Sequence, residues 1–177
     1  MAESDIDSMI AELIKREGGF TDKAADRGGP TNMGITLATL AESRGQAVTV
    51  DEVRALSEKE AAKIYRQRFY ADPRIDSLPE ALQPAVLDAG VMSGPKAAIE
   101  WLQRVASVFG REVAVDGVLG SYTVSAVNRA IQIHGLHFVI AAFTAARVRF
   151  YRELVEREPA QAVFLAGWIW RARGFLV

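Results

Sequence analysis

The sequence predicts a mainly α-helical fold with one small β-hairpin between residues 18 and 35. Apolar residues recur at helical spacing along most of the chain, in segments that end at glycine or proline. The one long departure is the glycine-rich stretch EGGFTDKAADRGGPTNMGIT, residues 17–36, which suits a turn between two short strands. Since no linker, low-complexity segment or internal repeat interrupts the 177 residues, we expect a single domain.

Four helices are expected in the first half of the chain, over about residues 6–17, 36–44, 57–69 and 77–92. The first follows from apolar periodicity and ends near Glu17. Thr36 is the expected N-cap of the second, and Gly45 closes it. The third and fourth each open on a capping box of the form S-x-x-E, at Ser57 and Ser77.

The second half of the chain is expected to be helical as well. Pro95 suits the first turn of a helix whose apolar stripe stops at Gly110. A turn at residues 116–117 precedes a helix over about 121–133, and the last two helices meet near Pro159.

Composition and charge exclude several classes of protein. Half of the residues are apolar and 24% are charged, which is typical of a globular protein. The net charge of −1 gives no general attraction to nucleic acid. Without cysteine, no disulfide, thiolate zinc site or cysteine nucleophile can form. The longest uncharged run, residues 130–146, is shorter than the ~20 apolar residues that span a bilayer, so we expect it in the core.

The glycine-rich stretch can bring two carboxylates together. Glycines at both ends of the loop allow the chain to double back, so that Asp26 can meet Glu17. On these residues alone, a capped helix followed by a solvated loop is the favoured interpretation. The alternative is a pair of carboxyl groups that hydrolyses a glycoside, in which one protonates the leaving oxygen and the other activates water. Glu17 follows the apolar face of a helix and is the better acid, Asp26 is the base in a wetter loop, and Thr31 can hold the water.

This stretch resembles the opening of glycoside hydrolase family 108, a family of lysozyme-like N-acetylmuramidases. The similar residues are EGGF, then Asp26, then GGPTNMGIT, and the likeness continues through RFYADPRIDSLP and LDAGVMSGPKAAIEWLQ. VDGVLGSYT is similar to the peptidoglycan-binding-like C-terminal part of that family. The resemblance implies a phage-type lysozyme-like α+β fold, with a catalytic part over 1–92 and a helical part over 93–177 that is integral to the same domain. It also reverses the preference for a solvated loop.

The activity that the resemblance implies is cleavage of the β-1,4 bond between N-acetylmuramic acid and N-acetylglucosamine in peptidoglycan. Glu17 is then the acid, Asp26 the base or charge stabiliser, and Thr31 the residue that positions water. The order Glu, Asp, Thr is similar to that of the phage lysozymes and implies an inverting arrangement. Two alternatives remain open: a lytic transglycosylase, which needs only the acid, and a non-catalytic protein of wall binding or secretion assembly.

Four residues are expected to contact the substrate, namely Phe20, Asn32, Met33 and Met92. Three of them depart from the family pattern. Phe20 stands where a tyrosine is expected, Met33 replaces an aromatic residue, and Met92 replaces an asparagine. Because each departure removes a polar or stacking group, affinity for the sugar is expected to fall by about 1 kcal/mol for each lost hydrogen bond.

The expected partner is the glycan strand of peptidoglycan, bound by a monomer without metal or cofactor. His134 and His137 are spaced i,i+3, but no third ligand follows at a metal spacing, so a structural or surface role is favoured. The N-terminus MAESDIDSMIAEL has acids where a signal peptide has basic residues. We therefore expect the chain to be cytoplasmic before export, and to reach the cell envelope or periplasm through a holin, a secretion system or another partner.

Aromatic and basic residues of the second half have structural and functional interpretations. Core packing is favoured over sugar stacking for Trp101, Trp168 and Trp170. A turn with a cap at Ser121 or Thr123 is favoured over a wall-binding motif for VDGVLGSYT. For the arginines a solvated helix face, paired with Glu153, Glu156 and Glu158, is favoured over attraction to acidic stem peptides. These arginines are Arg147, Arg149, Arg152, Arg157, Arg171 and Arg173.

Overall fold

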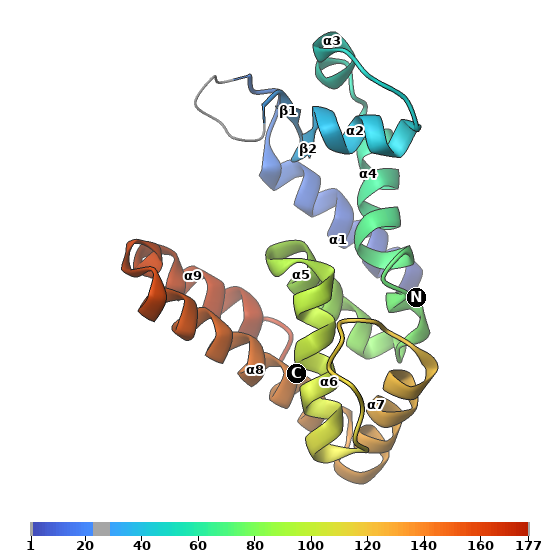
Figure 1. Cartoon of the computed structure of the whole chain (residues 1–177), viewed down its shortest axis with the longest axis vertical. Helices are drawn as coiled ribbons and strands as arrows, with labels where there is room; N and C mark the ends of the chain where they lie inside the picture. Colours follow the sequence, from blue (N-terminus) through green and yellow to red (C-terminus); the bar gives the residue numbers. More distant parts are fainter. Residues whose placement is uncertain (1, 23–28, 177) are drawn as a thin grey trace. The chain divides into compact units, whose positions relative to one another are not determined.

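The computed structural model describes residues 2–22 and 29–176 (Figure 1). The described residues form helices joined by short turns, with one two-stranded antiparallel sheet, so the predicted fold class is confirmed. The chain divides into two compact units, Met1–Arg68 and Phe69–Val177. The single-domain organisation, with parts over 1–92 and 93–177, stays a prediction.

The first unit is built around the pairing of two helices. Its elements are α1 (Ala2–Glu17), β1 (Thr31–Asn32), β2 (Ile35–Thr36), α2 (Leu37–Arg44), α3 (Val50–Arg54) and α4 (Glu58–Arg66). Helix α1 packs against α4. The predicted apolar stripe of α1 is buried, as is the stripe of α4 that includes Ala61 and Ile64. Ile6 and Ile10 are the most deeply buried residues of the α1 stripe.

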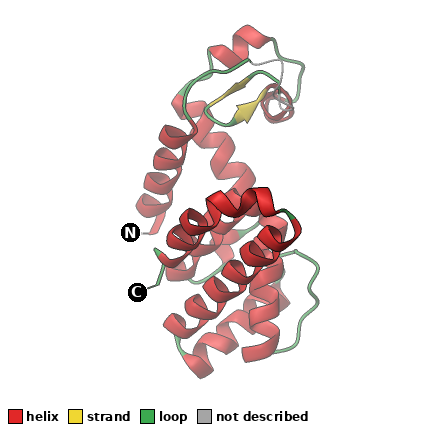
Figure 2. Ribbon diagram, turned by 90° about the vertical axis from the view of Figure 1, so that its left-hand side faces the viewer, coloured by secondary structure: helices red, strands yellow, loops and turns green. Residues whose placement is uncertain are grey.

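The predicted hairpin lies at the end of the glycine-rich stretch (yellow in Figure 2). Thr31 pairs with Thr36, and Asn32 pairs with Ile35. The two loop residues, Met33 and Gly34, have φ angles of 50° and 73°. Positive φ at both loop positions is the property of a type I′ turn, whose twist matches that of the flanking strands. The chain thus tolerates a methionine in the left-handed region at this turn.

Helices α2 and α3 follow from local capping. Thr36 caps α2 through a hydrogen bond from the Thr39 amide, and Gly45 ends it with a φ of 67°, as predicted. Sequence analysis missed α3. Its signal was a capping box at Thr49 and Glu52, where the threonine hydroxyl accepts from the Glu52 amide and the glutamate accepts from the Thr49 amide.

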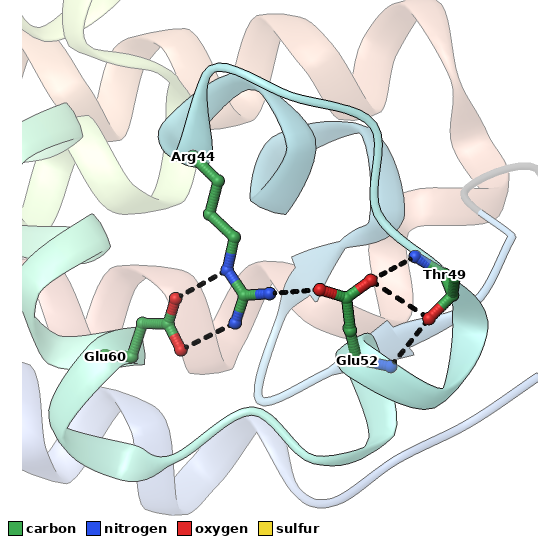
Figure 3. A network of polar contacts seen from close by, with 4 residues as sticks. All are labelled: Arg44, Thr49, Glu52 and Glu60. Atoms are coloured by element: carbon green, nitrogen blue, oxygen red, sulfur yellow. Dashed lines mark hydrogen bonds and ion pairs between the residues drawn. The ribbon is translucent and has the colours of Figure 1, made fainter.

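An arginine of α2 joins the three small helices of the first unit (Figure 3). Arg44 donates two hydrogen bonds to the Glu60 carboxylate, of 2.9 and 3.0 Å, and one of 2.8 Å to Glu52. The hydrogen bond from Arg44 lowers the pKa of Glu60. The pKa of Glu52 is lowered first by the backbone N–H of Thr49. The network links α2, α3 and α4.

The second unit contains the remaining helices. Its α-helices are α5 (Gln83–Ser93), α6 (Pro95–Phe109), α7 (Ser121–His134), α8 (Leu136–Arg157) and α9 (Ala162–Arg173). The shorter turns are η2 (Ile75–Ser77), η3 (Glu80–Leu82) and η4 (Pro159–Gln161). The π-helical turn η1 (Gln67–Ala71) follows α4 directly and contains the boundary between the two units. Helix α5 is buried along most of its length and packs on α6, which also contacts α7 and α8.

The helix predicted over 77–92 begins six residues later than expected. Ser77 does not cap a helix, and its hydroxyl donates to the Arg74 carbonyl at 2.7 Å. Leu78 would be the first helical residue after such a cap, but it precedes Pro79 and is extended, with a ψ of 157°. A residue before proline is driven out of the helical region by its contact with the proline ring. The capping-box prediction was therefore wrong at this position.

A second cap prediction was also wrong. The N-cap of α7 is Gly120, and no side chain caps it. Thr123 is buried, and its hydroxyl accepts a hydrogen bond from the side chain of Gln103. Gln103 also binds Asp116 through its amide group, so the turn before α7 is held from α6 and not by a cap.

Buried charges in the second unit correct the picture of a solvated arginine face. Arg147 is 1% exposed. It donates to Asp88 at 2.7 Å and to the Tyr151 hydroxyl at 2.8 Å. Arg171 donates to the other oxygen of Asp88, at 2.8 Å. Asp88 therefore joins α5, α8 and α9, whereas the expected surface pair between Arg149 and Glu153 is present.

The tryptophans differ in burial. Trp101 is buried, and Trp168 packs against the core cluster of Val148, Tyr151 and Ala172, so core packing is confirmed for these two. Trp170 is 79% exposed, and the core prediction was wrong for it. In the run VFLAGWIW the residues that face the core recur at helical spacing, and Trp170 lies outside that face.

No single helix in residues 2–22 and 29–176 is long and apolar enough to cross a membrane. Helices α7 and α8 together have the length and apolar composition of a membrane span, but the pair is bent by 118°.

Candidate active site

Glu17 is the last residue of α1, and its carboxyl group lies against the turn of the hairpin. A Cβ atom on Gly34 would come within 3.1 Å of Glu17 Cγ and 3.2 Å of its Oε2. Gly34 also has a φ of 73°, which disfavours any side chain. The turn can therefore approach the carboxyl group this closely only because glycine occupies position 34.

Tyr65 of α4 lies at the same point, and sequence analysis missed it. Its hydroxyl is a nearest neighbour of the Cβ position on Gly34, together with Glu17. It donates to the Met33 carbonyl at 3.2 Å. Burial, with the charge of Glu17, raises the pKa of Tyr65 to about 12, so the residue stays a neutral donor. The available signal was a tyrosine on the apolar stripe of an amphipathic helix, because a buried hydroxyl needs a partner.

The carboxyl group of Glu17 itself is exposed. The sequence suggested that the core would hold this side chain in an apolar setting, as a general acid requires. Instead, the buried apolar stripe of α1 ends at Ile14, three residues before Glu17, and Glu17 is exposed. This expectation was wrong for the described residues.

Thr31 occupies the first strand, half-buried, and its side chain is held in place. Its hydroxyl donates to the Gly29 carbonyl at 2.9 Å. A hydroxyl that donates to a carbonyl keeps its oxygen as an acceptor, so a water molecule can donate to it. The geometry suits the predicted role in positioning water.

Asp26 lies in the segment 23–28, outside the described residues, and so does Gly28. The two ends of that segment are joined by backbone hydrogen bonds of 2.8 and 2.9 Å between Thr21 and Thr31. Pairing of Asp26 with Glu17 stays a prediction.

Two of the three predicted substrate-contacting residues of the hairpin region contact α3. Phe20 is half-buried, and the guanidinium of Arg54 lies 4.5 Å from the centre of its ring. The amide of Asn32 donates to the carbonyls of Val53 and Arg54, at 3.0 and 3.1 Å. Asn32 is 6% exposed, and these bonds satisfy carbonyls near the C-terminus of α3. Met33 is 9% exposed and forms the turn.

Met92 belongs to the other unit. It lies in the last turn of α5 and is half-buried. The structure thus places Glu17 and Tyr65 against the turn formed by Met33 and Gly34. Thr31 and Asn32 form the first strand of the same hairpin. The role of Met92 at a common groove stays a prediction.

Comparisons with known proteins identify the family. Residues 10–94 match the model of glycosyl hydrolase 108, and residues 97–173 match that of a predicted peptidoglycan domain. The structure of SagA from Brucella abortus is similar to this one, with a TM-score of 0.73 and 32% identity over 98% of this chain and 92% of SagA. The chain belongs to glycoside hydrolase family 108. No curated protein matches it.

Family membership confirms the lysozyme-like fold and makes the protein a glycosidase that acts on peptidoglycan. All of the hairpin-region residues described above fall in the part that matches the hydrolase model. Of the predicted partners, the comparisons support peptidoglycan.

Proposed function

We propose that the protein is an N-acetylmuramidase that cleaves the β-1,4 bond between N-acetylmuramic acid and N-acetylglucosamine. The observation that carries this proposal is the position of Glu17, whose carboxyl group lies against the hairpin turn with the neutral hydroxyl of Tyr65 beside the same glycine. A carboxyl group at the end of a helix, fixed against a turn and open to a ligand, is suited to donate a proton to a glycosidic oxygen.

The proposed reaction uses two carboxyl groups and one hydroxyl. Glu17, protonated, donates its proton to the leaving oxygen as the bond to the anomeric carbon breaks. Asp26, ionised, takes a proton from a water molecule held by the Thr31 oxygen, and that water attacks the anomeric carbon from the opposite face. Attack from the opposite face inverts the configuration at that carbon.

Because Glu17 is exposed, the bound sugar itself would have to exclude water from this side chain. A carboxyl group in water favours its charged form, which cannot act as an acid. A glycan strand that covers Glu17 would displace water from this side chain and from the glycosidic oxygen beside it.

The test is digestion of purified peptidoglycan, with the released muropeptides resolved by mass. The wild-type chain is expected to release muropeptides with reducing N-acetylmuramic acid ends. Glu17→Gln keeps the shape of the side chain but cannot donate the proton, so we expect release to fall by about 100-fold or more. Glu12→Gln, on the same helix and exposed, is the matched control and should retain activity.

Other products would assign another function. Anhydro ends on muramic acid would identify a lytic transglycosylase. Binding to sacculi without release by the folded wild-type chain would identify a wall-binding or assembly protein. We also propose the cell envelope as the site of action, since peptidoglycan is located there.

A further inference from the structure

A groove between α6 and α8 is lined by charges of both signs. Its walls carry Glu100 and Arg104 from α6, and Arg149 and Glu153 from α8, and Trp101 and Phe150 line it as well. The groove has a volume of about 340 Å³, within the range of small-ligand sites. It is called the α6–α8 groove below. All of its lining residues belong to the second unit and to the part that matches the predicted peptidoglycan domain.

Each wall supplies one carboxylate and one guanidinium. Glu100 pairs with Arg104 at 3.2 Å, and Arg149 pairs with Glu153 at 3.4 Å, each within its own helix. The side chains of these pairs are between 27% and 71% exposed. Pairs of this kind on a helix surface contribute little to stability, so a ligand can exchange partners with them at small cost.

The lining restricts the chemical class of the ligand. A polyanion would be repelled by the two carboxylates, and a polycation by the two guanidiniums. A neutral sugar can form hydrogen bonds with these side chains but supplies no ionic partner for any of the four, so it uses less of the lining than a zwitterionic ligand does. The half-buried ring of Phe150, which packs on the buried ring of Trp101 with centroids 4.9 Å apart, adds apolar surface that suits short aliphatic side chains. The matching ligand is a small peptide with free carboxylates and a free ammonium group.

We propose that the α6–α8 groove binds the peptide stem of peptidoglycan. The second unit would then recognise the peptide, and the first unit would cleave the glycan. Stem peptides carry carboxylates and, on their diamino acid, an ammonium group. The carboxylates would pair with Arg104 and Arg149, and the ammonium with Glu100 or Glu153. This inference rests on the proposed function in that peptidoglycan is the substrate.

The experiment measures binding of a synthetic stem peptide, L-Ala-γ-D-Glu-diaminopimelate-D-Ala, by calorimetry. All proteins carry Glu17→Gln, so that hydrolysis plays no part. The groove variant is Glu100→Gln with Arg149→Gln, which removes one charge of each sign. Its matched control is Arg129→Gln with Glu156→Gln, an exposed pair of substitutions in the same unit with the same change in charge. Ala97→Leu fills the groove without removing a charge.

We expect the peptide to bind the parent and the matched control with equal affinity. The groove variant and Ala97→Leu should each bind about tenfold more weakly or worse, because charge-assisted hydrogen bonds or the space itself are lost. A disaccharide of the two amino sugars without peptide should bind all four proteins alike.

Three results would overturn the inference: no binding of the peptide to the parent, equal binding by the parent and both altered grooves, or a loss in the matched control as large as in the groove variant. Failure of the groove is distinguishable from failure of the proposed function. Release of muropeptides by the wild-type chain without peptide binding refutes the groove alone, whereas peptide binding without release refutes the hydrolase proposal alone.

Discussion

The two units of this chain differ in how deeply their main ion-pair networks are buried. In the second unit, Asp88 and Arg147 are buried at 4% and 1% exposure and bind each other directly. In the first unit, Arg44 and its two glutamates lie near the surface, around small helices that support the hairpin. Removing one member of a buried pair leaves an uncompensated charge, whereas surface pairs contribute little. The difference indicates that a buried ion pair specifies the packing of the second unit, whereas the ion pairs around Arg44 only tune the stability of the first.

The strongest test of this comparison is Asp88→Asn. The substitution leaves two guanidiniums without their counter-charge, one of them fully buried, so we expect the free energy of unfolding to fall by about 3–5 kcal/mol. All three tryptophans lie in residues 69–177, so their fluorescence during urea unfolding reports the second unit. Glu156→Gln, on the exposed side of α8, is the control. A loss below about 1 kcal/mol would contradict the role given to Asp88.

Gly34→Ala should have the next largest effect, and on the other unit. The new methyl group would meet the Tyr65 hydroxyl and the Glu17 side chain, in addition to the cost of a positive φ. We expect about 1–3 kcal/mol of destabilisation and a loss of muropeptide release. Gly45→Ala is the matched control, since its φ is 67° and no atom lies within 4 Å of the added Cβ. Equal losses of activity in both variants would show that backbone strain alone is responsible.

Tyr65→Phe is expected to act on the site more than on the fold. It removes the hydrogen bond to the Met33 carbonyl and leaves that carbonyl without this donor, at a cost of about 1 kcal/mol. We expect about a tenfold slower release of muropeptides, since the turn and Glu17 lose their shared neighbour. Far-UV circular dichroism should show a retained fold. Unchanged activity would remove Tyr65 from the site.

The smallest effect concerns pH and the surface network of the first unit. The pKa values of Glu52 and Glu60 are lowered from 4.5 by Thr49 and Arg44 respectively. A lowered pKa contributes stability above the unfolded value, and this stability is lost as pH falls through the folded value. We therefore expect stability to decline as pH falls below about 4.5. Arg44→Met should make the free energy of unfolding less dependent on pH in this range, because the pKa of Glu60 is no longer lowered by Arg44. Unfolding can be followed by far-UV circular dichroism at several pH values. An unchanged pH dependence would contradict the role given to Arg44.

Local signals predicted most of the helices, and the wrong predictions have both local and non-local causes. Thr36 and Gly45 act where the sequence placed them, because capping depends on neighbours along the chain. Ser77 failed because the proline two residues later outweighed the capping box. Arg147 failed because its partner is Asp88, 59 residues earlier, and no local pattern shows that pairing.

The residues of the candidate site likewise include some that the sequence could place and some that it could not. Glu17, Thr31 and Gly34 lie in one short motif, so the sequence could place them together. Tyr65 reaches the site only through the packing of α4 against α1, which the sequence pattern does not specify. The exposure of Glu17 likewise depends on what surrounds the end of the helix, and periodicity along α1 gives no information about it.

Thr36 ends β2 and at the same time caps α2, while the Leu37 amide donates to the Pro30 carbonyl at 3.0 Å. No spare residue separates the hairpin from the helix. Inserting one residue there would part the cap from the strand pair that positions Thr31. For protein engineering, residues 29–45 should therefore be treated as one segment. A chimera between relatives should exchange the hairpin and α2 together, because a hairpin from one relative would not align Thr36 with the α2 helix of another.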